Sequence, residues 1–175
     1  MLLEGARTCA CKLRMMKIFV QDGNKMFLAI GNIKNANIKA IRMAMYFIGK
    51  DLVKTSQELI QSKDKSGRVY KLKSGTVTRL HQSSAPGEAP ANFSGNLRKS
   101  LGFEVRGADQ LEFGSRSGAP TAGLSNKQAV AKYSKFLEEG TSKMAPRPYL
   151  KPSFEKNKGN ILQHFERLLE EEFTK

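Results

Sequence analysis

The side chains that could do chemistry in this sequence are few and scattered. His81 and His164 are not accompanied in the sequence by the other members of a catalytic triad. Cys9 and Cys11 are separated by one residue instead of the two of a CxxC motif, and no second Cys/His pair follows them. We therefore predict no catalytic residue, no metal and no cofactor, with a hydrolase centred on either histidine kept as a third hypothesis.

Two further patterns also lack the features that catalysis would need. Glu138 and Glu139 are adjacent, which on a helix sends their side chains in different directions and does not make an acid–base pair. Gly114 and Gly118 frame a glycine-rich segment, but no Lys-Ser/Thr follows, and the segment comes after an antiparallel hairpin. These patterns predict a protein without enzymatic activity.

The strongest chemical signal is positive charge. The chain has 30 Lys and Arg against 16 Asp and Glu, a formal charge of +14. A basic two-stranded ribbon could contact nucleic-acid phosphates without sequence preference, or meet an acidic protein partner. It could equally be a solvated edge, since lysines protect exposed strands from aggregation. The densest basic stretch holds Lys63, Lys65, Arg68, Lys71, Lys73 and Arg79.

Length and hydropathy indicate one soluble, intracellular domain. A chain of 175 residues can bury a substantial core, and no apolar run approaches the ~20 residues that would cross a membrane. Residues 1–15 read differently from the rest. We expect them to be disordered or to be an extension translated from an upstream start, which leaves 16–175 as the domain.

Apolar periodicity predicts the helices. A stripe with helical spacing runs from Ile38 to Leu59 and predicts a helix over 38–61. Similar spacing predicts helices over 127–139 and over about 153–173. Ser94 is a plausible N-cap for a short helix that ends near Leu101.

Alternating apolar residues around turn signals predict three β-hairpins. The turns are Asp22-Gly-Asn, Ser74-Gly and Gly107-Ala-Asp-Gln. The proline- and glycine-rich segments 82–91 and 116–126 are expected to be mobile loops, and 144–152 to be extended. This order predicts an α+β fold, an antiparallel β-sheet built from hairpins and packed against the long helix of the N-terminal half and the C-terminal helix.

Two segments together resemble a known family. The first motif comprises residues 84–90 (SAPGEAP) and 94–101 (SGNLRKSL), and is similar to an APGxP segment followed by TGxLxxSI. The second motif, residues 133–154 (YSKFLEEGTSKMAPRPYLKPSF), is similar to YAxYVEFGTxxxxARPFLxPA. Both resemble the head–tail connection proteins of long-tailed bacteriophages and prophages, also called neck, tail-completion or minor tail proteins. The resemblance covers about 38–173. Ser94, Phe93 and Glu139 depart from that pattern.

Several motif residues have plausible physical roles in the fold or at an interface. Gly95 and Gly140 suit positive φ where the chain reverses. Arg147, held in extended backbone beside prolines, could pair with a carboxylate, for which Glu138 is the candidate. The motif positions that we assign to fold or interface are Ser94, Gly95, Leu97, Tyr133, Phe136, Glu138, Gly140, Thr141, Arg147, Pro148 and Tyr149.

The resemblance implies a virion structural protein, one subunit of a ring at the head–tail junction, present in the host cytoplasm before assembly. Its partners would be copies of itself, with a hexamer expected, and neighbouring head–tail proteins. The loops 82–91 and 116–126 would serve as assembly arms. The alternative is a basic accessory protein that binds nucleic acid through 63–79.

Overall fold

The computed structural model describes residues 16–21, 25–30, 38–74, 76–107, 110–116 and 127–173. Residues 1–15 and 117–126, and with them the expected N-terminal extension and most of the second expected loop, lie outside the described residues. The elements are β1 (Met16–Gln21), β2 (Lys25–Ile30), α2 (Ile38–Gln61), β3 (Val69–Ser74), β4 (Val77–Gln82), α3 (Asn96–Ser100), β5 (Leu101–Arg106), β6 (Gln110–Ser115), α4 (Lys127–Glu139) and α5 (Leu150–Phe173).

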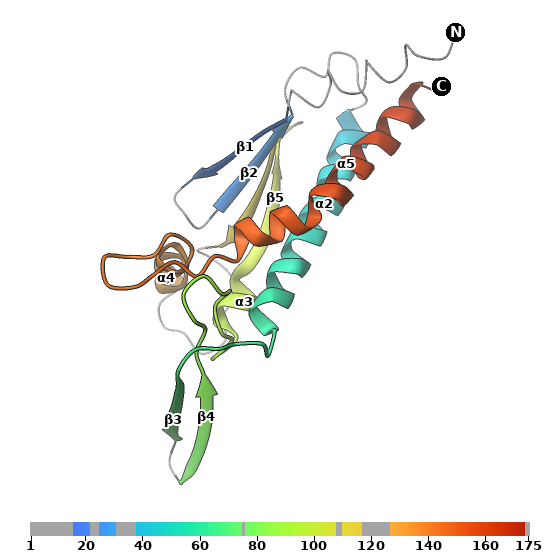
Figure 1. Cartoon of the computed structure of the whole chain (residues 1–175). Coiled ribbons are helices and arrows are strands. Elements are labelled where there is room, and N and C mark those ends of the chain that lie inside the picture. The colour runs from blue at the N-terminus through green and yellow to red at the C-terminus, as the bar shows by residue number, and fades with distance from the viewer. Residues whose placement is uncertain are drawn as a thin grey trace.

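The predicted α+β class is confirmed, and all three expected hairpins form. β1–β2 and β5–β6 join through β2 and β6 into one antiparallel sheet of order β1-β2-β6-β5. The third hairpin, β3–β4, does not enter this sheet and forms a separate two-stranded one. It projects away from the helices and the larger sheet (Figure 1).

Helix α2 packs on β5 and β6 of the four-stranded sheet, and α5 packs on α2. Its bounds agree with the prediction. The buried stripe drifts, however: Ile38 is 57% exposed, and Ile60 is buried where a strict seven-residue repeat would have used Leu59. The cause is geometric, because a straight helix with 3.6 residues per turn rotates away from a seven-residue repeat.

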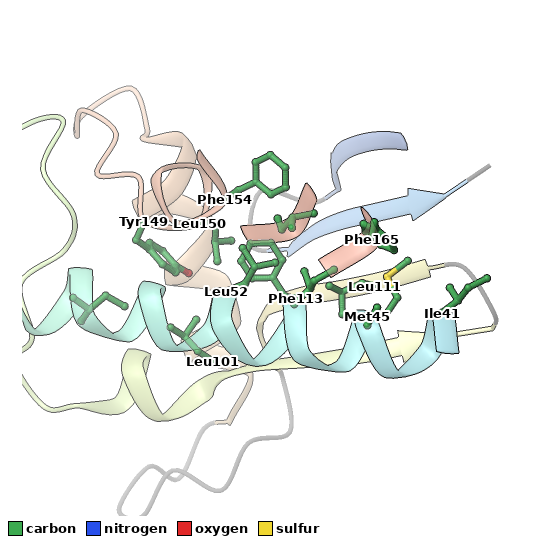
Figure 2. Packing of buried hydrophobic residues seen from close by; sticks show 14 of the residues in the cluster. Ile41, Met45, Leu52, Leu101, Leu111, Phe113, Tyr149, Leu150, Phe154 and Phe165 are labelled. Atoms are coloured by element: carbon green, nitrogen blue, oxygen red, sulfur yellow. The ribbon is translucent and has the colours of Figure 1, made fainter. Parts of the chain in front are cut away.

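The core forms where α2 meets β5, β6 and α5. Figure 2 shows Met45 and Leu52 of α2 among Leu111, Phe113 and Phe154. The sheet approaches α2 closely because Gly49 lacks a side chain. A Cβ atom there would lie 2.4 Å from the ring of Phe103.

Polar side chains link α2 to α5 within this packing. The Oγ of the buried Ser56 lies 2.8 Å from both the Leu52 carbonyl oxygen and Ser153 Oγ, so its single hydroxyl proton is shared between these two acceptors. Asn157 Nδ2 donates to Thr55 Oγ1 at 2.8 Å. Buried polar groups need such partners, so these bonds favour one register of the two helices.

One buried carboxylate lies on the sheet. Glu112, in the middle of β6, is 5% exposed. Lys25 Nζ lies 2.5 Å from its Oε1, and Arg106 Nη2 lies 2.7 Å from its Oε2. Because a buried charge is costly without a counter-ion, these two cations on the neighbouring strands make the position tolerable for an acid.

The last helix begins earlier than predicted, at Leu150. Pro152, expected in the extended segment, lies instead in the first turn of α5. A helix tolerates proline there because the first N–H groups have no partner within the helix. No helix in the described part of the chain is long and apolar enough to span a membrane.

Candidate functional site

The second motif forms the connection from α4 to α5, and Glu138 is its central side chain. Its Oε2 accepts hydrogen bonds from the backbone N–H groups of Tyr149 (2.9 Å) and Leu150 (3.1 Å), and its Oε1 accepts one from Lys151 (3.1 Å). These donors lie at the start of α5, where N–H groups lack intrahelical acceptors and a negative charge is favoured. Glu138 therefore caps a helix that begins twelve residues after it in sequence.

The predicted ion pair between Glu138 and Arg147 is wrong. The carboxylate is occupied by the three main-chain donors. The Arg147 backbone N–H donates to the Leu137 carbonyl at 2.7 Å, which fixes the main chain, and its Nη1 lies 3.5 Å from Met144 Sδ. Its Nε is buried and has no hydrogen-bond partner among the described residues. The guanidinium is thus left with only a weak sulfur acceptor.

Gly140 is required where α4 ends, as predicted from its type. Its φ is +79°, and a Cβ atom there would lie 2.9 Å from both the Met144 carbonyl oxygen and the Pro146 nitrogen. Thr141 and Met144 then pair across a tight turn, with Thr141 N–H donating to the Met144 carbonyl at 2.8 Å. The turn sends the chain through the half-buried Pro148 back toward the core.

Tyr149 anchors this connection inside the protein. It is wholly buried, and its hydroxyl forms a 2.5 Å hydrogen bond with Ser134 of α4. Burial raises the pKa of Tyr149 far above its usual range, so it is the neutral hydroxyl that makes this bond. Ser134 could not be identified from the sequence, because nothing there pairs it with Tyr149. Tyr133 is half-buried, and burial raises its pKa as well. Phe136, by contrast, is 49% exposed.

The first motif forms α3 and the loop before it. The prediction that Ser94 caps this helix is wrong: the N-cap is Gly95, whose φ of 75° is left-handed and which makes no side-chain cap bond. Ser94 Oγ instead accepts a long hydrogen bond (3.4 Å) from Asn96 N–H. Leu97 is buried in the core. The expected positive φ at Gly95 is confirmed, and it places the helix start one residue later than the serine.

The loop 82–91, expected to be mobile, is held in place. Gly87 N–H donates to the Pro146 carbonyl at 2.9 Å and so links the first motif to the second. The Glu88 carboxylate accepts hydrogen bonds from the Ser66 hydroxyl, from Ser66 N–H and from Ala85 N–H. These bonds, together with the charge of Lys65, lower the pKa of Glu88 to about 2. A loop bonded in this way to two other segments of the chain is not a free arm.

The two motifs meet around a pocket of about 370 Å³. Ser94, Gly95 and Leu97 of the first motif line one part of it, and Tyr133, Leu137 and Arg147 of the second line another. His81, at the base of β4, also lines it, and its ring lies edge-on to Phe93 with the centroids 5.0 Å apart. No Asp or Glu is among the described residues that line it.

The basic residues of 63–79 divide into two groups. Lys65 is half-buried, and its Nζ donates to the Leu59 carbonyl at 3.0 Å, at the end of α2. Burial lowers its pKa, against the raising effect of Glu88 and Asp64. Lys65 is therefore a helix C-terminal contact rather than an exposed phosphate contact. The exposed basic side chains are Lys63, Arg68, Lys71 and Arg79; that of Lys73 lies outside the described side chains.

The hairpin β3–β4, which we call the arm, carries these charges together with exposed apolar side chains. Val69, Tyr70 and Leu80 are 53%, 48% and 69% exposed. The register pairs Lys71 with Leu80, and Tyr70 with His81, so a lysine and a histidine lie opposite an apolar and an aromatic residue on the neighbouring strand. The arm is tied to the body at its base, where Gly67 N–H donates to the Ser83 carbonyl at 3.0 Å.

The second histidine lies far from this site in the fold. His164 Nε2, on α5, lies 3.5 Å from Asp51 Oδ2, and its ring stacks on Phe47 of α2 with the centroids 6.3 Å apart. Through these contacts His164 helps to pack α5 on α2.

No protein-family model, curated protein or solved structure was found that matches this chain.

Proposed function

We propose that this protein is a non-enzymatic structural subunit of a bacteriophage virion, one member of a ring at the head–tail junction that is needed for neck or tail completion. The proposal rests first on the resemblance of the two motifs. It is supported by the packing of the motifs against each other, since Gly87 of the first is hydrogen-bonded to Pro146 of the second. Other residues of the two motifs line the same pocket. Such a packed unit presents a shaped surface, and this role needs no reactive groups.

The observation that carries the assembly role is the arm. A two-stranded hairpin is marginally stable by itself in water, yet this one presents Val69, Tyr70 and Leu80 to solvent. Its two strands pair with each other and leave both outer edges open, which favours pairing with another chain. In a ring, contacts between identical subunits are heterologous, so the arm of one copy would meet a different surface of the next. The arm thus replaces the loop 82–91 as our candidate assembly element, and the loop 116–126, most of which lies outside the described residues, stays a prediction.

The lining of the pocket supports the non-enzymatic part of the proposal. General acid–base catalysis needs groups that can exchange protons next to a substrate. His81 is the histidine on this wall, and no described carboxylate faces it. A binding surface for another protein accounts for the same residues without a reaction.

The proposed ring has six subunits and contacts neighbouring head–tail proteins, in the virion after assembly and in the host cytoplasm before it. The test is a mass measurement by light scattering at high protein concentration. We expect a species near 117 kDa, which is about six chains of 19.5 kDa. The variant V69T/L80T removes exposed apolar surface but keeps residues that suit a strand, so it should remain folded and monomeric.

A monomer at every concentration, or a V69T/L80T variant that assembles as well as the unmodified protein, would exclude this role for the arm. The genes beside this one give an independent check, because portal, capsid and tail-tube genes should flank it.

The exposed Arg68, Lys71 and Arg79 favour a second candidate, a nucleic-acid-binding accessory protein. In that case duplex DNA affinity should fall steeply with added salt and be abolished by K71E/R79E. The two functions separate cleanly: V69T/L80T should impair ring formation and leave DNA binding intact, whereas K71E/R79E should abolish DNA binding. Absence of DNA binding at low salt eliminates the second candidate.

A further inference from the structure

Arg147, on the wall of the pocket between the two motifs, has no carboxylate partner among the described residues. The backbone bond to Leu137 fixes the main chain of Arg147, and its side chain lines the pocket. Its Nε is buried without an acceptor, and the contact of its Nη1 with Met144 Sδ is weak. A partly buried guanidinium gains most from a carboxylate, which can accept two parallel hydrogen bonds from it. A carboxylate is therefore the group that this side chain would bind most strongly in the pocket.

We propose that the pocket binds a carboxylate side chain, presented by a segment of a neighbouring protein, with Arg147 as its counter-ion. The lining also includes the polar side chains of Asn92, Ser94 and Asn96. Ile60, Leu97 and Leu137 contribute apolar surface to it. An Asp or Glu side chain followed by an apolar residue matches this division, since the carboxylate meets the guanidinium and the apolar group fills the remainder.

The size of the pocket and the residues at its mouth favour a protein segment over a free ion. The volume of about 370 Å³ exceeds what one carboxylate needs. Phe93, 66% exposed, lies at the rim against His81, and Tyr70, the register partner of His81, is exposed on the adjoining strand. Exposed aromatic rings beside an arginine are typical of the anchor points of protein interfaces. Arg68 at the base of the arm adds positive charge that complements an acidic segment.

This inference rests on the proposed function only for the identity of the partner, as a neighbour in the same assembly. The site itself can be tested with small probes on the full chain, whether it is a monomer or a ring. Ligand-observed NMR would measure the binding of 3-phenylpropionate, an apolar carboxylate. Its neutral analogue, 3-phenylpropanamide, has nearly the same shape.

We expect saturable binding of 3-phenylpropionate with a Kd on the order of millimolar, as is usual for so small a ligand. The amide should bind at least roughly tenfold more weakly than the acid. R147Q should abolish the preference for the acid, and R147K should keep part of it. The matched control is R98Q, because Arg98 also has a buried Nε without a partner but is not among the residues that line the pocket. R98Q should bind like the unmodified protein.

Equal binding of acid and amide, no saturable binding of either, or unchanged acid preference in R147Q would overturn the proposal. Urea midpoints of the variants show whether a loss reflects unfolding, and the R147K result then decides the question if R147Q is unfolded. A ring that forms normally without carboxylate binding would refute this site alone. Carboxylate binding by a protein that stays monomeric would refute the ring and leave the site.

Discussion

The most informative stability test is removal of the Glu138 carboxylate, for which E138A is the variant. Three backbone N–H groups at the start of α5 would lose their acceptor, and one belongs to the wholly buried Tyr149. Loss of a helix cap costs ~1 kcal/mol, hydrogen bonds to a charged group contribute about 1.5–3 kcal/mol, and the charge–dipole contribution adds ~0.5 kcal/mol. These contributions overlap, so we expect the free energy of unfolding to fall by about 3 kcal/mol.

The measurement is urea unfolding followed by circular dichroism, with E139A as the matched control. Glu139 is the next residue, is 48% exposed at its side chain, and lies at the distance limit of an ion pair with Lys135 (4.0 Å). Removing it should cost less than about 0.5 kcal/mol. E138Q should fall between the two, because an amide oxygen still accepts one or two of the bonds.

A loss in E138A no larger than that in E139A would refute the capping role. A double-mutant cycle with R147Q distinguishes it from the ion pair that the sequence indicated. The structure predicts that the effects of E138A and R147Q add to within about 0.5 kcal/mol, whereas a direct ion pair would produce a clear coupling energy.

Three further perturbations test other parts of the fold, each by thermal or urea unfolding. G140A should lower the free energy of unfolding by more than ~2 kcal/mol, because positive φ and close backbone atoms both exclude a side chain. G159A, in an open helical position, should raise it by about 0.5–1 kcal/mol, and equal effects of the two variants would contradict this. Y149F should cost about 1–3 kcal/mol by leaving the buried Ser134 hydroxyl without its partner, and no loss would mean that the bond does not form. The pKa of Glu88, about 2, lies below its value in the unfolded chain, so its carboxylate stabilises the fold above about pH 4.5, and this stabilisation disappears as the pH falls toward 2. The variant E88Q should therefore lose less Tm than the unmodified protein when the pH is lowered. An unchanged dependence of Tm on pH at acid pH would show that Glu88 does not contribute.

The helices and hairpins could be predicted because their signals are local. The apolar stripe after Ile38 and the turn signals at 74–75 and 107–110 involve residues a few positions apart, and the corresponding elements form with nearly the predicted bounds. The start of α5 was missed because Pro152 is read as a helix breaker, although a proline fits a first turn.

The partners of side chains could not be predicted in the same way. An acid and an arginine in one motif suggested an ion pair, but Glu138 instead meets the main-chain donors of α5. Which groups it reaches depends on the turn at Gly140, whose conformation is set by contacts with Met144 and Pro146. Likewise, the alternation in 69–82 predicts strands without saying which strands pair with them.

The amino-acid sequence by itself therefore determined the succession of helices and strands, the excess of positive charge and the glycines at chain reversals, since each follows from neighbouring residues. Only the tertiary structure decided that β3–β4 projects as an arm, that 83–91 is fixed to the second motif, and that Arg147 lines the pocket with its Nε unpaired among the described residues. These features depend on contacts between segments far apart in the chain. The free energy of such contacts depends on the shape and burial of whole elements, and local sequence patterns contain no information about either.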